Sequence, residues 1–211
     1  MISNFSFPHS TPFNLSGSGK VIATDDPLQV TGISGTPVIW SGTSAPALIP
    51  NPPALSPDGS FFSVQTDSLA VDPPMTCDIY QNGTLVTAVP GYAAGWIDNG
   101  HIFVQNWKYT DKGAVFTGIG VYSPDGKELI SYPADAIPAI NNPQFLPGNL
   151  VFDLGFDQAG RYGGTGSIYS LTDGSLVWQA PSAARTSNGV AAVSGSDVVF
   201  QVGHQVLLYP Y

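Results

Sequence analysis

Cysteine, basic residues and glutamate are all scarce in this chain. Among its 211 residues there is one cysteine, there are six lysines and arginines, and the single glutamate is Glu128. A lone Cys77 excludes an internal disulfide, and its place in an apolar run favours a buried side chain over a reactive thiol. No apolar run approaches the roughly 20 residues of a membrane-spanning helix, so no membrane span is predicted.

The scarcity of positive charge restricts the partners of the protein. Fifteen acidic residues give a net charge of −9, which repels phosphate backbones and argues against nucleic acid. Only 10% of the residues are charged, a composition common in extracellular and virion proteins. The first ten residues, MISNFSFPHS, contain neither the basic nor the apolar part of a signal peptide. We expect an extracellular or virion-surface location, and a cytoplasmic one stays open.

Glycine, proline and short apolar runs are abundant instead, and one complete unit shows how they are arranged. The runs are Gln144–Leu146, Asn149–Leu154, Ser167–Leu171 and Ser175–Pro181. The turns Pro147-Gly148 and Thr172-Asp173-Gly174 join them in pairs, and a glycine-rich loop joins the pairs. Runs rich in β-branched and aromatic residues between such turns predict a four-stranded antiparallel unit made of two hairpins.

The unit repeats along the whole chain. The first strand of each unit is marked by Leu15, Leu55, Ile97, Phe145 and Val193, which are 40, 42, 48 and 48 residues apart. Each outer strand ends in a proline: Pro50, Pro90, Pro133 or Pro181. Proline is tolerated at the ends of edge strands because no ladder donor is lost there. A four-stranded unit of about 40–50 residues is typical of a propeller blade.

The last unit is incomplete, and the other end of the chain supplies what it lacks. Gln205–Tyr211 provides a third strand, and Ser3–Pro8 has the outer-strand pattern with its final proline. The sequence therefore predicts an all-β fold, a five-bladed β-propeller of four-stranded antiparallel blades whose ring the N-terminal strand closes. We expect a single domain, residues 1–211, with blades at about 9–50, 51–90, 91–133, 134–181, and 182–211 plus 1–8.

Several segments resemble known propeller repeats at the level of architecture. Residues 169–178 resemble the outer hairpin of quinoprotein-type repeats, and the Ser-Pro-Asp-Gly turns at 56–59 and 123–126 resemble those of WD-type and TolB-type blades. The Gly-His and Trp-Asp pairs of WD repeats are absent, and the quinoprotein repeat appears clearly once, so no quinone is implied. Such turns indicate a fold, not a function.

Unequal loop lengths indicate where a binding site would lie. Short turns join strands one to two and three to four, whereas long loops are expected between strands two and three at 25–36, 67–76, 107–117 and 156–165. Because binding residues concentrate on loops held by a rigid scaffold, we place a site on this long-loop face. The candidates are Tyr92, Trp107, Tyr109, Asn142, Asp157, Arg161, Tyr162 and His204. Their aromatic rings would stack on a glycan or anchor a protein, and the alternative is that they are ordinary solvated loop residues.

Catalysis has weaker support. A resemblance to five-bladed glycosidases of the arabinanase-like and sucrase-like kinds would imply an acidic residue on an inner strand and a glutamate that acts as the acid. The inner strands expected here carry no carboxylate. Asp153 and Asp157 are the pair that a loop-aspartate hydrolase would use.

No metal or cofactor site is predicted either. His9, His101 and His204 lack the spacing of metal ligands, and Asp25, Asp26, Asp67 and Asp157 would suit calcium but match no known calcium loop. We therefore predict no cofactor and no catalytic residue. The preferred function is a non-catalytic binding or assembly module for a glycan or protein, and the alternatives are a virion or cell-surface receptor-binding protein and a glycan-active hydrolase.

Overall fold

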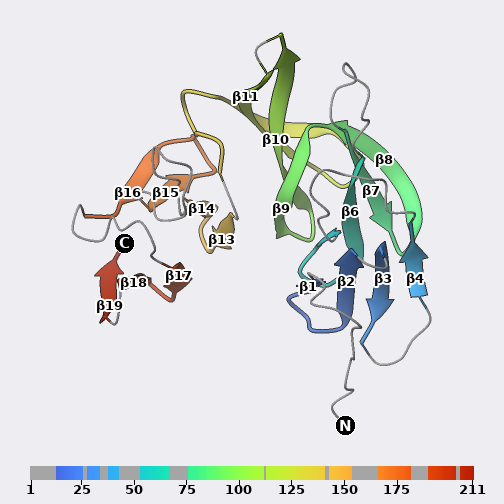
Figure 1. Ribbon diagram of the computed structural model, residues 1–211, viewed down its shortest axis with the longest axis horizontal. Coiled ribbons are helices and arrows are strands. Elements are labelled where there is room, and N and C mark those ends of the chain that lie inside the picture. Colours follow the sequence, from blue (N-terminus) through green and yellow to red (C-terminus); the bar gives the residue numbers. More distant parts are fainter. Residues whose placement is uncertain are drawn as a thin grey trace. The chain divides into compact units, whose positions relative to one another are not determined.

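The computed structural model describes residues 13–25, 28–33, 38–42, 53–66, 76–111, 113–140, 143–153, 166–181, 190–202 and 205–211. These residues form nineteen strands in five antiparallel sheets (Figure 1). Within them, no helix has the length and apolar character needed to cross a membrane. The chain divides into two compact units, Met1–Ser131 and Tyr132–Tyr211.

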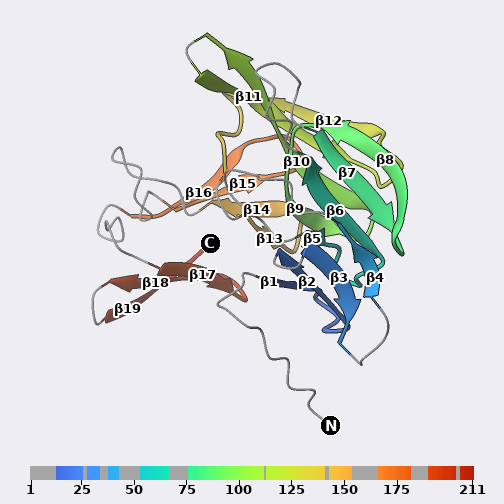
Figure 2. The ribbon, with the colours of Figure 1, turned by 45° about the vertical axis from the view of Figure 1, so that its right-hand side comes forward.

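Three four-stranded sheets make up the first unit, each a meander in chain order (Figure 2). The first sheet consists of β1 (Phe13–Leu15), β2 (Val21–Asp25), β3 (Leu28–Gly32) and β4 (Val38–Ser41). The second consists of β5 (Ala54–Leu55), β6 (Phe61–Thr66), β7 (Thr76–Gln81) and β8 (Thr84–Pro90). The third consists of β9 (Tyr92–Asp98), β10 (His101–Thr110), β11 (Gly113–Tyr122) and β12 (Glu128–Pro133), whose last residues belong to the second unit.

The second unit holds two further sheets. One is four-stranded, with β13 (Gln144–Leu146), β14 (Leu150–Asp153), β15 (Ser167–Ser170) and β16 (Leu176–Gln179). The other has three described strands, β17 (Val190–Ser194), β18 (Asp197–Val202) and β19 (Gln205–Pro210). The predicted hairpins of the second to fifth units are confirmed, and the proposed closing strand, Ser3–Pro8, lies outside the described residues.

The first sheet departs from the sequence prediction. Its expected long loop at 25–36 instead contains strand β3, and the fourth strand is β4, which ends at Ser41 and not at Pro50 as predicted. The segment after Asp25 carries aspartate, proline and glycine, which suggested a loop, but Leu28–Gly32 pairs along the whole of β2. Pairing with a neighbouring strand thus outweighs the weak local strand preference of this segment.

Each apolar core lies between two neighbouring sheets. The first joins Val21, Ala23 and Val30 of the first sheet to Phe62 of the second. A further core joins the second and third sheets through Cys77, Ile79, Val89, Trp96, Ile102, Val104 and Tyr122. In the second unit, Phe152, Ile168 and Val198 are buried together. The middle sheet of the first unit therefore contributes to a core on each face, through Phe62 on one side and through Cys77 and Ile79 on the other.

Polar contacts between successive first turns fix the spacing of the sheets in the first unit. The Ser18 amide donates to the Pro57 carbonyl at 2.7 Å, and the Ser18 hydroxyl donates to the Asp58 carbonyl at 3.2 Å. The Asp58 amide in turn donates to Oδ1 of Asn99 at 3.0 Å. The turns of the three sheets are thereby linked one to the next, with each donor and acceptor about one repeat apart.

The outer strands share a local irregularity. In three sheets, one residue of the fourth strand has no partner in the register with the third strand: Ile39, Val86 or Val177. These are β-bulges, which twist an edge strand and discourage another strand from pairing with it. By contrast, β19 pairs with β18 without a break, from Asp197↔Pro210 to Val202↔Gln205.

Candidate functional site

A β-hairpin that extends beyond the rest of the third sheet carries Trp107 and Tyr109, and the predicted site residue Tyr92 lies on β9 beside its base. Strands β10 and β11 pair from Ile102↔Tyr122 as far as Thr110↔Gly113. The neighbouring strand β9 pairs with β10 only as far as Gln105↔Tyr92. Residues 106–117 therefore project as a two-stranded hairpin, which we call the aromatic hairpin. The prediction of a long loop at 107–117 is wrong.

Alternating residues explain why this segment forms strands. Trp107 pairs with Phe116, and their rings meet edge to face with centroids 5.3 Å apart and planes at 62°. Such cross-strand aromatic pairs stabilise an antiparallel ladder. At the closed end, the Thr110 hydroxyl donates to the Gly113 carbonyl at 2.9 Å. This contact and the aromatic pair outweigh the charged residues that suggested a loop.

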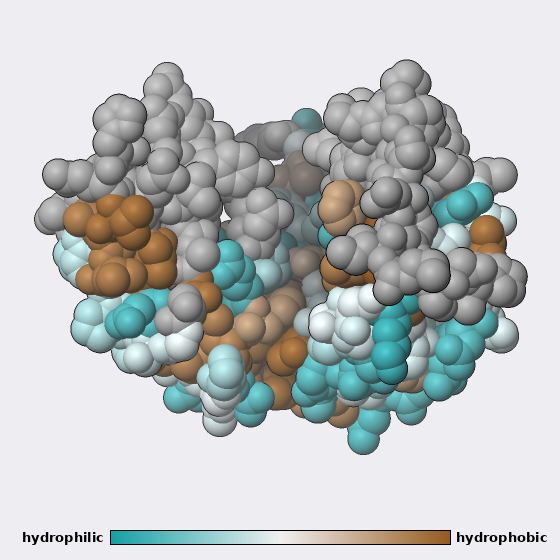
Figure 3. Space-filling view, turned by 90° about the horizontal axis from the view of Figure 1, so that it is seen from below, coloured by the Kyte–Doolittle hydropathy of each residue, from teal (hydrophilic) through white to brown (hydrophobic). Residues whose placement is uncertain are grey.

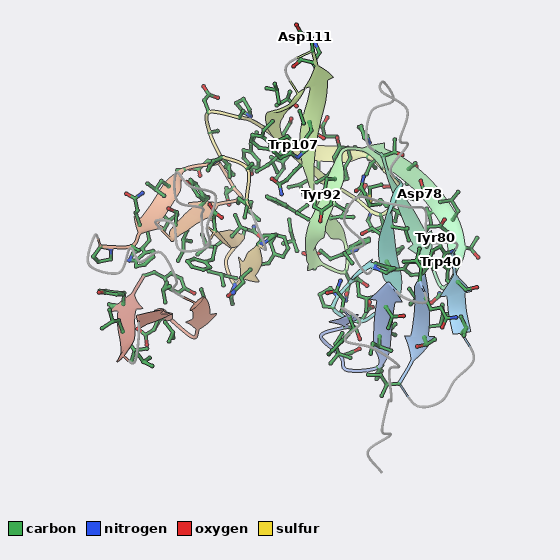
Figure 4. The ribbon with its side chains drawn as sticks, in the orientation of Figure 1. Trp40, Asp78, Tyr80, Tyr92, Trp107 and Asp111 are labelled. Atoms are coloured by element: carbon green, nitrogen blue, oxygen red, sulfur yellow. The ribbon has the colours of Figure 1, made fainter. Side chains whose placement is uncertain are left out.

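One face of the hairpin and its base is aromatic. Gln105 and Trp107 are two residues apart on β10, and Tyr92 lies directly opposite Gln105 on β9, so all three share a face of the sheet. Tyr92, Trp107 and Phe116 are each half-buried, whereas Gln105 is 4% exposed. Figure 4 shows Tyr92 and Trp107 following one another along this end of the sheet.

Buried polar groups anchor the base of the hairpin. The Thr117 hydroxyl donates to the Asn106 carbonyl at 3.1 Å, beside the bulge between Asn106 and Trp107. Burial raises the pKa of Tyr122, the Glu128 charge and a hydrogen bond with Glu128 raise it further, and a hydrogen bond with Asn106 opposes the rise.

The remaining candidates are only partly within the described residues. Tyr109 lies in β10, where its backbone pairs with Ala114. The other candidates, Asn142, Asp157, Arg161, Tyr162 and His204, lie outside the described residues. The structure therefore brings Tyr92 and Trp107 to one face and leaves the rest of the predicted set untested.

The titratable residues that are described form no metal-binding cluster. Nowhere in the described ranges do three or more histidine, cysteine, aspartate or glutamate side chains converge on a metal-sized site. His101 contacts the Asp98 carboxylate at 2.8 Å, and both side chains are about half exposed, at 46% and 54%. Asp153 is buried at the end of β14, and its proposed partner Asp157 lies outside the described residues.

Phe116 and Gln105 belong to the aromatic face but were not predicted from the sequence. Their signal was the alternation of polar and aromatic residues in Asn106–Tyr109 together with the short apolar run Ala114–Phe116, which is consistent with paired strands. Lys108, Asp111 and Lys112 obscured it because clustered charge near a glycine usually marks a loop. With the pairing recognised, Phe116 falls opposite Trp107 without further information.

No protein-family model matches the sequence, and no curated protein matches it either. Solved structures do resemble the fold. Kuenenia stuttgartiensis hydrazine synthase is 12% identical with a TM-score of 0.56, over 95% of this chain and 58% of that chain. The chain thus spans less than two thirds of hydrazine synthase. A putative TolB from Agrobacterium tumefaciens is 17% identical with a TM-score of 0.53, over 95% of this chain and 81% of that chain. KlAtg21, solved with the coiled-coil of AgAtg16, is 10% identical with a TM-score of 0.53, over 93% of this chain and 68% of that chain.

These likenesses and the meandering sheets show that the chain has β-propeller architecture. Propellers repeat four-stranded sheets around a central axis and are common as binding and assembly modules. At such low identity the likeness shows the fold alone, so any function has to be argued from the side chains.

Proposed function

We propose that this protein is a non-catalytic binding or assembly module and that the aromatic hairpin contacts its partner. The observation that carries the proposal is the extension of β10 and β11 beyond β9, with Trp107 and Phe116 packed edge to face on it. A two-stranded ribbon is marginally stable alone, so its aromatic face gains from being covered. Tryptophan and tyrosine are the residues that most often dominate binding energy at interfaces.

A protein partner is favoured over a glycan. KlAtg21, whose fold resembles this one, was solved with a coiled-coil of AgAtg16. The far strand of the hairpin adds Val115, which is 49% exposed, so the hairpin offers aliphatic as well as aromatic surface. A glycan would use the same rings for stacking, with the amide of Gln105 and the hydroxyl of Tyr92 nearby. A virion-surface or cell-surface role, with the partner a receptor, is a variant of the same proposal and accords with the low charge content.

The test is a binding comparison with matched variants. Purified protein is screened against a glycan array and used to capture partners from the native host, in parallel with Trp107→Ala and Leu176→Ala. Leu176 is 51% exposed on β16 and serves as the control for loss of surface apolar area. We expect any specific partner to lose about tenfold or more in affinity with Trp107→Ala alone. Equal binding by all three proteins would refute the role of the hairpin.

We also propose that the propeller has five blades and that residues Ser3–Pro8 complete the last one beside β19. The support is the regular outer edge of β19, where Val206 is 66% and Leu208 62% exposed, in contrast to the bulged outer strands of other sheets. In Figure 3, brown hydrophobic atoms gather at the left, on the side where Figure 1 draws both β16 and β19. An unprotected apolar edge is a site for another strand.

Deleting residues 1–8 tests this closure. The shortened chain should unfold at a lower urea concentration, and a synthetic peptide of residues 1–10 should restore the midpoint while a scrambled peptide should not. An unchanged midpoint after the deletion would exclude a closing strand at this position.

A glycan-active hydrolase is the second candidate, favoured by the burial of the Asp153 carboxylate at a strand end. Glycosidases hold the carboxyl group that serves as acid catalyst in a buried, apolar environment. Turnover of glycan substrates that is abolished by Asp153→Asn would support it, and the absence of turnover in the unmodified protein would remove it.

A further inference from the structure

A half-buried carboxylate without a charged partner lies in the middle of strand β7. Asp78 pairs with Val64 of β6 on one side and with Ala88 of β8 on the other. No hydrogen bond or ion pair joins its carboxylate to any residue that the structure describes. Aspartate is disfavoured inside strands, and an unpaired charge loses solvation when partly buried. Its presence here therefore needs an explanation outside the fold.

Aromatic side chains lie next to Asp78 along the same face of β7. Tyr80 lies two residues from Asp78 on the same face of β7, and its ring stacks on Phe62 with centroids 5.0 Å apart and planes at 1°. Trp40, from the preceding sheet, packs against Tyr80 with centroids 5.3 Å apart and planes at 53°. Figure 4 shows Asp78, Tyr80 and Trp40 in succession along this part of the unit. All three side chains are half-buried and so retain contact with solvent.

Electrostatics connect the carboxylate to the rings. The pKa of Tyr80 is raised, first by burial and then by the negative charge of Asp78, while a hydrogen bond with Trp40 opposes the rise. The charge of Asp78 therefore contributes to the raised pKa of the Tyr80 hydroxyl. The result is a negative charge two residues along β7 from a tyrosine whose ring packs against a tryptophan.

Among the described residues, the strands around this place offer no cation. The surrounding strands β4, β6, β7 and β8 contain no lysine, arginine or histidine. The four lysines of the first unit are Lys20, Lys108, Lys112 and Lys127, and no arginine occurs there. Among them Lys20 and Lys127 are exposed beside turns and Lys108 is exposed on the aromatic hairpin.

We propose that Asp78, Tyr80 and Trp40 form a recognition site for an organic cation, namely an alkylammonium or guanidinium group presented by a basic partner. A cation near the face of a tryptophan or tyrosine is attracted by the ring quadrupole, and the attraction grows as water is excluded. The Asp78 carboxylate would supply the opposite charge for the bound cation. The net charge of −9 favours the approach of such a partner. This site is separate from the aromatic hairpin, so either proposal stands if the other fails.

The experiment uses small cations as probes and the indole N–H signal of Trp40 as the reporter, assigned with Trp40→Phe in ¹⁵N-labelled protein. Tetramethylammonium chloride is titrated against sodium chloride at equal ionic strength and against neutral tert-butanol. Butylammonium and butylguanidinium then distinguish a lysine-like from an arginine-like source. We expect a saturable shift with organic cations only, weakened about tenfold by Asp78→Asn. The control Asp111→Asn removes one exposed charge at the hairpin tip, away from these rings, and should bind as the unmodified protein does.

Stability provides an independent readout. Because Asp78 has no described partner, Asp78→Asn should leave the urea midpoint unchanged or raise it while binding weakens. Functional residues often show this opposition between stability and binding. The proposal is overturned if tert-butanol shifts the signal equally, if no organic cation shifts it, or if Asp78→Asn binds as tightly as the unmodified protein. A lower urea midpoint, or failure to fold, would show instead that the carboxylate serves the fold.

Discussion

Gly83 in the β7–β8 turn gives the most direct test of how the sheets of the first unit pack. With Asn82 at φ 49° and Gly83 at φ 85°, the turn has the two left-handed residues of a type I′ hairpin. A Cβ at Gly83 would lie 2.3 Å from the carbonyl oxygen of Ile39 in the preceding sheet. That oxygen is backbone at the β4 bulge, so it cannot move aside as a flexible side chain would.

The expected cost of Gly83→Ala has two parts. The left-handed conformation costs alanine about 1–2 kcal/mol, and the reduced freedom of the unfolded chain returns about 0.4–1 kcal/mol. The contact adds to this because real Cβ atoms essentially never approach within 3.0 Å, so the turn or the outer strand must shift. Overpacking of this kind costs roughly 1–3 kcal/mol. We expect a total loss of about 2–4 kcal/mol.

Gly19, in the first turn of the same unit, serves as a control that measures the conformational cost of alanine without the steric contact. Its φ is 67°, and no atom lies within 4 Å of the position that the methyl group of an alanine would take there. Gly19→Ala should therefore cost only about 1 kcal/mol. The assay is urea unfolding followed by tryptophan fluorescence, with midpoints compared at equal m-values. Equal losses for the two variants, within about 0.5 kcal/mol, would refute the close packing of the β7–β8 turn on Ile39.

Three further predictions concern acid stability, a buried hydroxyl and the thiol. Hydrogen bonding, chiefly from the Ser60 amide, lowers the pKa of Asp58 below 3.8, so its stabilising contribution is complete above pH 3.8 and is lost as pH falls through the lower folded value. Urea midpoints between pH 6 and pH 2 should therefore fall less steeply in Asp58→Asn than in the unmodified protein. The Tyr132 hydroxyl donates to the buried carbonyl of Leu171, and Tyr132→Phe should cost about 1–2 kcal/mol in urea unfolding, whereas an unchanged midpoint would show that the bond contributes nothing. Burial raises the pKa of Cys77 to about 12 and leaves the side chain 0% exposed, so a thiol reagent at pH 8 should react only as the protein unfolds; rapid labelling of folded protein would contradict this.

Hairpins with strong turn chemistry were predictable from the sequence. The turns around Asp58, Asn82, Asp125 and Asp173 follow short β-rich runs, and each falls where the structure has a turn. Side chains reinforce them: the Asp58 carboxylate accepts from the Ser56 hydroxyl at 2.9 Å and from the Ser60 amide at 2.9 Å. Local residues suffice to define such turns, so no tertiary information was needed.

Strands defined mainly by their neighbours were not predictable. Leu28–Gly32 has one fully buried apolar residue, Val30, and the aromatic hairpin carries several charges. Both segments become strands through pairing, with β2 in one case and between β10 and β11 in the other. Site residues on such strands were hard to predict for the same reason. Trp107 was predicted as a loop residue and Asp78 was not singled out, because the meaning of each depends on what lies across the ladder.

The repeat period, however, contains more information than the strand pattern alone. Asn14 and Pro53 are about one period apart in the sequence and are joined by a hydrogen bond, and so are Trp96 and Ala54. Where the period lengthens, Val193 contacts Gln144, 49 residues away. In a fold of stacked equivalent sheets, residues at equivalent positions of neighbouring units lie close together, so the spacing of the markers predicts long-range contacts directly. The rule does not cover every long-range contact. Trp40 and Tyr80 are also about one period apart, but Trp40 lies on the fourth strand of its sheet and Tyr80 on the third strand of the next, so their contact follows from the packing of the two sheets.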